Sequence, residues 1–122
     1  MRIRPIPKHL LIHSAELITV YDPDKWGNGA MKSVSLEHVR IEPSHRQSAD
    51  TSGAVIQAEA VLIYDVINSV PKDVSFALCG DRVNEHTVKL QQVRFGGRLY
   101  TVHKIDMLFS GSGLHHIEVM LV

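Results

Sequence analysis

The stretch Val88-Lys-Leu-Gln-Gln-Val-Arg-Phe-Gly-Gly-Arg-Leu-Tyr-Thr-Val102 decides the fold class of this chain. β-Branched and aromatic residues, which favour strands, lie on both sides of Gly96-Gly97. Both glycines can adopt positive φ angles without a steric penalty. The pair therefore predicts a tight hairpin turn between one strand at 88–95 and another at 99–109.

Further strands are predicted on both sides of this hairpin. Ser110-Gly-Ser-Gly113 turns the chain into a last strand at 114–122. Residues 54–67 fit either a helical stripe or a buried strand, and their β-branched content favours a strand over 58–66. The remaining runs rich in Leu, Ile, Val and Thr predict strands at 9–21, 31–42 and 74–78.

The run 31–42 contains an irregularity. Val34 and Leu36 occupy even positions, whereas Val39 and Ile41 occupy odd positions. One extra residue in a strand moves the following side chains to the opposite face of the sheet. The slip at Glu37-His38 therefore predicts a β-bulge.

About seven strands, joined by regular turns and without a convincing long helical pattern, predict a mainly β fold. We expect a small single-domain β-barrel, or a barrel-like sandwich, that spans residues 1–122. The stretch 44–53 contains almost no apolar side chain and is expected to be a long, exposed polar loop. Residues 1–8 include Pro5 and Pro7 and are expected to be extended.

The composition is that of an ordinary globular domain, with 122 residues, 44% hydrophobic and 21% charged. Thirteen basic residues balance thirteen acidic ones, so no global field attracts nucleic acid or an anionic membrane. The lone Cys79 cannot form an internal disulfide and is expected to be a small, half-buried side chain. Without an apolar signal segment or a run of about 18 apolar residues, the expected compartment is the cytoplasm.

No phosphate-binding glycine loop and no nucleophile elbow occurs in the sequence, and we expect neither catalysis nor a cofactor. The best enzyme-like pattern lies in the histidines His9, His13, His115 and His116. If the first and last strands paired, three of these imidazoles could hold zinc, with water as a fourth ligand. Surface or interface histidines are the favoured interpretation, because no paired cysteines and no His-Glu-x-x-His motif accompany them.

A second alternative is a barrel that binds single-stranded nucleic acid. Such barrels combine a basic groove with aromatic side chains on which bases stack. The residues of this kind near the hairpin are Arg94, Phe95, Arg98, Tyr100, His103 and Lys104. A solvated basic hairpin is the simpler interpretation, because aromatic residues make up only 6% of the chain.

Several segments, spread over nearly the whole chain, form an ordered set. They are Arg4-Pro-Ile-Pro-Lys-His-Leu-Leu-Ile-His13, Asp24-Lys-Trp-Gly-Asn28, His38-Val-Arg-Ile-Glu-Pro-Ser44, Leu62-Ile-Tyr-Asp-Val-Ile-Asn-Ser69, Phe95-Gly-Gly-Arg-Leu-Tyr-Thr-Val102 and Leu114-His-His-Ile-Glu118. In this order the set resembles the minor capsid proteins of tailed phages and prophages of Gram-positive bacteria. The segment Cys79–Thr87 departs from the resemblance, because it is longer and more polar.

The resemblance implies a structural role at the head–tail junction of the virion. Relatives among the head-completion, or stopper, proteins are small β-barrels that form a ring below the portal and extend its DNA channel. The resemblance thus implies a homo-oligomeric ring, contacts with portal or adaptor proteins and with tail-completion proteins, and DNA that passes without sequence-specific binding. It implies no membrane partner, and a place in the virion neck after assembly in the host cytoplasm.

In such relatives a long loop from each copy helps to close the channel, and the polar stretch 44–53 is the segment that matches it. The expected assembly or channel residues are Ser44, His45, Arg46, Gln47, Ser48 and Asp50. Trp26 is the expected rigid anchor, either in the core or against a neighbouring subunit. The alternative for the loop is plain exposure to solvent.

Overall fold

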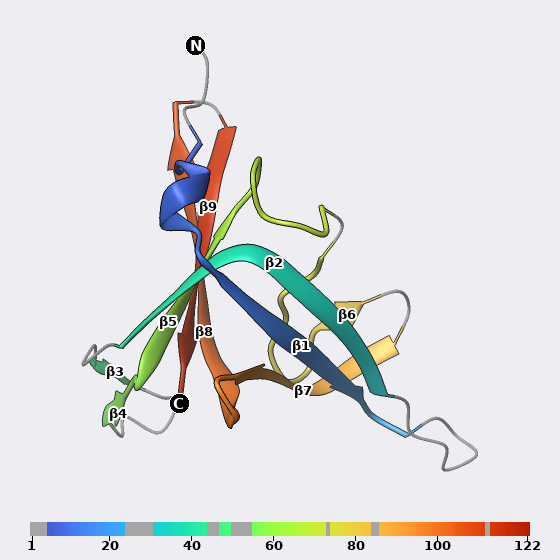
Figure 1. Ribbon diagram of the computed structural model, residues 1–122. Coiled ribbons are helices and arrows are strands. Elements are labelled where there is room, and N and C mark those ends of the chain that lie inside the picture. The colour runs from blue at the N-terminus through green and yellow to red at the C-terminus, as the bar shows by residue number, and fades with distance from the viewer. Residues whose placement is uncertain are drawn as a thin grey trace.

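The computed structural model describes residues 5–23, 31–43, 47–49, 55–72, 74–83, 86–111 and 113–122. Almost all regular structure in these residues is β-sheet (Figure 1). The elements are the 3₁₀ turn η1 (Lys8–Leu10) and the strands β1 (His13–Tyr21), β2 (Met31–Pro43), β3 (Gln47–Ala49), β4 (Val55–Gln57), β5 (Ala60–Asp65), β6 (Arg82–Val83), β7 (His86–Phe95), β8 (Arg98–Ser110) and β9 (Gly113–Leu121). Among the described residues, no helix is long and apolar enough to cross a membrane.

Six strands close a barrel. Their order is β1-β2-β5-β9-β8-β7, and β7 pairs back onto β1. Each of these pairings is antiparallel. β6 adds a short ribbon to β7, while β3 and β4 form a separate hairpin. The predicted small, mainly β barrel is confirmed.

The inward-facing side chains of these strands form one apolar core. In β5, Ala60, Leu62 and Tyr64 belong to it, whereas the alternate residues Val61 and Ile63 belong to a separate small cluster. Burial of each Leu, Ile or Val contributes about 1.5–3 kcal/mol. The core consists of Leu17, Leu36, Val39, Ile41, Ala60, Leu62, Tyr64, Val93, Val102, Ile117, Val119 and Leu121.

The predicted bulge in β2 is confirmed. His13 pairs with Val39 and Ala15 pairs with Leu36, so two residues of β2 lie opposite one residue of β1. His38 has a φ of 55°, in the left-handed region that non-glycine residues rarely adopt. The bulge bends β2, whose second half then pairs with β5.

The predicted hairpin turn between β7 and β8 is also confirmed. Gly96 and Gly97 have φ angles of 60° and 77°, the positive values that a type I′ turn requires at both central positions. No atom lies within 4 Å of a Cβ built on either residue. The glycines are therefore required by backbone conformation and not by a lack of space.

The strand predicted at 74–78 is wrong. This segment packs beside β7, but its backbone bonds to a side chain instead of a strand. The amide of Ala77 donates to Oε1 of Gln91 at 2.7 Å, and Nε2 of Gln91 donates to the carbonyl of Ser75 at 2.8 Å. Alternate apolar residues of the segment pack against the core, which explains the strand-like pattern in the sequence.

Other boundaries differ by smaller amounts. The strand predicted at 9–21 begins at His13, because residues 8–10 form η1. The strand favoured over 58–66 is confirmed as β5. Part of the predicted polar loop is β3, which pairs with β4, so the stretch 44–53 is not a loop throughout. Cys79 is exposed, not half-buried as expected, and lies in the turn at 79–80.

Candidate assembly surface

Asp65, the last residue of β5, fastens neighbouring segments at one end of the barrel. Its carboxylate accepts hydrogen bonds from the backbone amides of Ile6 at 3.0 Å, Ile67 at 3.1 Å and Asn68 at 2.7 Å. Asp65 is 0% exposed. A buried carboxylate with several N–H donors is stable because these bonds replace its lost hydration.

Two further side chains of the same turn complete this network. Nδ2 of Asn68 donates to the carbonyl of Ile6 at 2.7 Å. Oγ of Ser69 accepts from the amide of Asp65 at 2.9 Å and donates to the carbonyl of His38 in the bulge. The N-terminal segment, the bulge of β2 and the turn after β5 are thereby joined at one end of the molecule.

Beside this network, β8 and β9 extend past the closed part of the barrel (Figure 1). β8 pairs with β9 from Val102 to Ser110, but with β7 only from Arg98 to Thr101. Within the part of the chain that the structure describes, no strand pairs with the other edge of residues 103–110. Such an edge presents unpaired N–H and C=O groups to any extended chain that approaches it.

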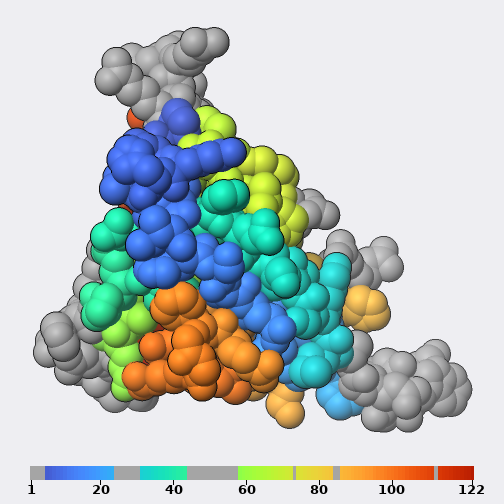
Figure 2. All heavy atoms as spheres, in the orientation of Figure 1, coloured from blue at the N-terminus to red at the C-terminus, as the bar shows by residue number. Residues whose placement is uncertain are grey.

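Exposed apolar side chains gather at the same end. Met107, Leu108 and Phe109 are 55%, 37% and 68% exposed, and they lie where the hairpin of β8 and β9 turns. The turn after β5 reaches the start of β9 through a hydrogen bond from the amide of Val66 to the carbonyl of His115. The N-terminal segment adjoins the same turn, through the hydrogen bonds that join Ile6 to Asp65 and Asn68, and Figure 2 shows this segment in blue against the yellow-green residues that follow β5. We define the apolar end as the exposed residues Leu10, Ile12, Ile67, Met107, Leu108 and Phe109.

Charged side chains border the apolar end on the β8–β9 hairpin. Nζ of Lys104 lies 3.7 Å from Oδ1 of Asp106, and Asp106 pairs in register with Glu118. Nε2 of His116 lies 3.0 Å from Oε2 of Glu118. Charges near a free edge disfavour indiscriminate strand pairing. The hairpin thus combines an apolar tip with a charged stem.

The structure does not bring the four candidate histidines together. β1 and β9 are not neighbours in the barrel, so the strand pairing that a zinc site required does not occur. His13 has a packing role, since its Nδ1 accepts from the amide of Ile41 at 3.0 Å and its ring lies 4.9 Å from that of Phe95. His9 lies exposed in η1, and His115 contacts His116. The described residues contain no group of three or more potential metal ligands.

The residues expected in the channel loop fall largely outside the described part of the chain. This holds for Ser44, His45, Arg46, Asp50 and the anchor candidate Trp26. Gln47 and Ser48 lie in β3. The backbone of β3 and β4 is therefore the only described feature of this candidate site.

In the hairpin considered for nucleic-acid binding, the two arginines form ion pairs and the two aromatic rings already have packing partners. Arg94 pairs with Glu16 at 3.3 Å, and Arg98 pairs with Glu59. The guanidinium of Arg98 also lies 4.8 Å from the ring centre of Tyr100. Phe95 packs against the core. These residues therefore do not form the basic groove with exposed aromatic rings that binds single-stranded nucleic acid.

Two features of this surface were not predicted from the sequence. Asp65 at the end of a strand, followed by Asn68-Ser69, is a pattern typical of Asx turns and could have indicated the network. The run Met107-Leu-Phe109 breaks the alternation of β8 directly before a turn. Consecutive apolar residues at a strand end are a signal of an exposed apolar tip.

The comparisons with known proteins bear on what this surface is for. No curated protein and no solved structure matches the chain. The family model described as "Minor capsid protein" matches residues 7–121, which is nearly the full length and includes all six barrel strands. The chain belongs to the minor capsid protein family.

Proposed function

We propose that this capsid protein is a structural component of the head–tail junction, where copies form a ring that extends or closes the DNA channel of the portal. The observation that carries the proposal is the β8–β9 hairpin, which joins a free strand edge to the exposed apolar end. Both features favour contacts with other protein chains. Family membership supports a structural and not a catalytic role.

The partners in this proposal are further copies of the chain, a portal or adaptor protein, and a tail-completion protein. The fold supports such a role because the closed core stabilises each subunit on its own, leaving the hairpin and loops for docking. Near-zero net charge suits a channel through which DNA slides without sequence-specific binding. The segment 44–53, which includes β3, remains the proposed channel segment, with Trp26 as an anchor.

Deletion of the gene from its parent phage, followed by electron microscopy of lysates, tests the role. We expect filled or leaking heads beside separate, complete tails, and restored particles when the wild-type gene is supplied. Phe109→Lys should fail to restore them, because a charge replaces an apolar side chain that is 68% exposed at the apolar end. Normal, infectious particles from the deletion would contradict the proposal.

Leu99→Lys is the matched control. Leu99 is 46% exposed next to the turn of the β7–β8 hairpin, outside the apolar end. The gene that carries Leu99→Lys should restore particles as well as the wild-type gene does. In denaturant unfolding, the free energy of unfolding of both variant proteins should lie within about 0.5 kcal/mol of the wild-type value, since both sites are on the surface. Equal complementation by the two variants would remove the apolar end from the proposal.

A further inference from the structure

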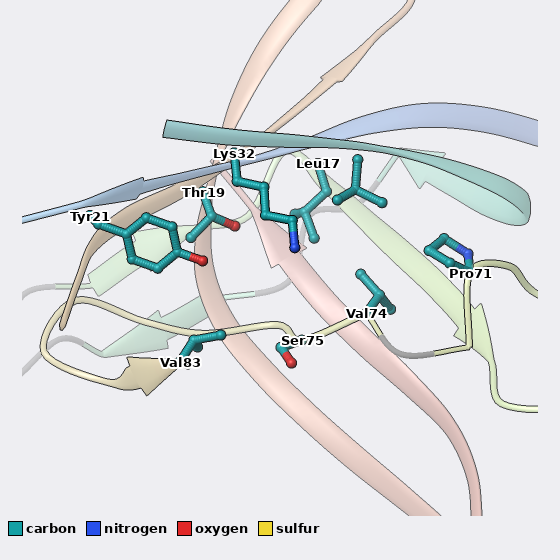
Figure 3. Close-up of a pocket in the computed structure, with 9 residues that line it drawn as sticks. Leu17, Thr19, Tyr21, Lys32, Pro71, Val74, Ser75 and Val83 are labelled. Atoms are coloured by element: carbon teal, nitrogen blue, oxygen red, sulfur yellow. The ribbon is translucent and has the colours of Figure 1, made fainter. Parts of the chain in front are cut away.

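A pocket of about 270 Å³ lies between the β1–β2 pair and the connection that leads to β7, and none of its lining residues belongs to the apolar end (Figure 3). Its walls combine apolar and polar surface in nearly equal shares, contributed from both sides. Binding sites for drug-sized molecules usually have volumes of about 300–1,000 Å³. This pocket therefore suits a group the size of a side chain. Its lining residues are Leu17, Thr19, Tyr21, Lys32, Val34, Pro71, Val74, Ser75 and Val83.

Polar groups converge on this pocket. Figure 3 shows the Lys32 ammonium group directed into it, with the hydroxyl groups of Tyr21 and Thr19 nearby. Within the described part of the chain, Lys32 forms no ion pair, and the Tyr21 hydroxyl forms no hydrogen bond although Tyr21 is only 9% exposed. Thr19 is held in place, because Nε2 of the buried Gln91 donates to its Oγ1 at 3.0 Å.

We propose that this pocket binds a carboxylate carried on a short apolar stem. One ammonium group matches one negative charge, and a phenol hydroxyl beside it can donate a second, charge-assisted hydrogen bond. The apolar walls of Leu17, Val34 and Val74 bury the stem. A phosphate group fits less well, because the described lining residues include no arginine to bind it with two parallel hydrogen bonds.

Two sources can supply this chemistry: an acidic side chain of a partner protein, or a free aliphatic acid. The inference does not depend on the head–tail role, since the pocket lies on strands β1 and β2 and the connection to β7. Its failure would leave the particle-assembly experiment unaffected.

The test is a titration of the full-length, ¹⁵N-labelled chain with 3-methylbutanoate, followed by NMR. We expect shifts of the amides around Thr19, Lys32 and Ser75, with a dissociation constant on the order of 1 mM for so small a ligand. Lys32→Met should weaken binding by about threefold to fivefold, because Lys32 is exposed and water screens its charge, and Tyr21→Phe by about threefold to tenfold. Lys89→Met, which removes an exposed lysine outside the pocket, should leave the affinity unchanged.

Comparison ligands make the result decisive. 3-Methylbutan-1-ol and 3-methylbutylamine share the stem but lack the carboxylate, and neither should saturate the pocket. Binding of all three ligands with equal affinity, or unchanged binding by the Lys32→Met protein, would overturn the proposal. N-acetylglutamate N-methylamide separates the two sources. If this compound binds more tightly than 3-methylbutanoate, the ligand of the pocket is an acidic side chain of a partner protein. If it binds more weakly, the ligand is a free aliphatic acid.

Discussion

The Asp65 carboxylate connects sequence-distant parts of the chain through a few atoms. Its oxygens accept three backbone amides, one of them from Ile6 in the N-terminal segment. Each hydrogen bond to a charged group contributes about 1.5–3 kcal/mol of net stability, after allowance for the bond to water that it replaces. Because the residue is fully buried, no water can substitute for a lost partner.

Asp65→Asn tests this network at nearly constant volume. The new amide group must face at least one N–H donor, which leaves buried donors unsatisfied. We expect the free energy of unfolding to fall by about 2–4 kcal/mol in urea denaturation, and the amide of Ile6 to exchange faster. Asp106→Asn, at a carboxylate that is 34% exposed, is the control and should cost less than about 1 kcal/mol. Equal effects of the two substitutions would refute a special role for Asp65.

Among the elements, the segment 74–78 is unusual because a side chain of β7 satisfies its backbone. Gln91, 2% exposed, bonds at once to Thr19, Ser75 and Ala77. The segment can therefore cross beside the barrel without becoming a strand. The same glutamine positions Thr19 at the wall of the pocket.

Gln91→Met preserves length and removes these hydrogen bonds. We expect the amide of Ala77 to lose its protection in hydrogen exchange, and global stability to fall by about 2–3 kcal/mol, because the Ala77 amide and the Thr19 hydroxyl lose their partner. Gln92→Met, at the neighbouring and partly exposed position, should leave the exchange of Ala77 unchanged. Unaltered exchange of Ala77 in the Gln91→Met protein would show that backbone contacts alone hold the segment.

Local signals predicted the elements that depend on local physics. The parity change at Glu37-His38 and the pair Gly96-Gly97 each act within a few residues, and both predictions are confirmed. The strand predicted at 74–78 is wrong because its backbone partner is the side chain of Gln91, more than ten residues away along the chain. Alternating apolar residues indicate that one face of a segment is buried, but they do not indicate which groups form hydrogen bonds with its backbone.

Strand order depends on contacts that a sequence pattern does not contain. The first and last strands were candidates for pairing, and the structure places β1 between β2 and β7, and β9 between β5 and β8. This arrangement separates His13 from His115 and His116. The residues of the apolar end also come from three distant segments, so no local run of sequence could have shown them as one surface.

At the scale of the whole molecule, closure of the barrel couples the strands to one core. Leu36 and Leu17 lie on adjacent strands and are 0% and 2% exposed. Because each strand of the barrel has two neighbours, loss of packing at one site weakens contacts around the entire ring of strands. We therefore expect unfolding in a single cooperative transition.

Leu36→Ala tests this coupling. The cavity left in the core should lower the free energy of unfolding by about 3 kcal/mol, and amides of all six barrel strands should exchange faster by a similar factor. Leu99→Ala, at a residue 46% exposed, should change stability by less than about 0.5 kcal/mol. Faster exchange confined to β1 and β2 in the Leu36→Ala protein would show that the barrel opens in parts.

The positions of β1 and β9 also determine how the barrel would respond to a pulling force. Each of these strands, the first and the last of the barrel, pairs with a neighbouring strand on both sides over most of its length. A force that pulls on either strand along its length therefore acts on many hydrogen bonds at once, in shear, and cannot open them one after another as in a zipper. Resistance to such a force depends on the barrier to unfolding more than on equilibrium stability. A subunit built in this way can be pulled from both ends of its barrel while the core between them stays closed.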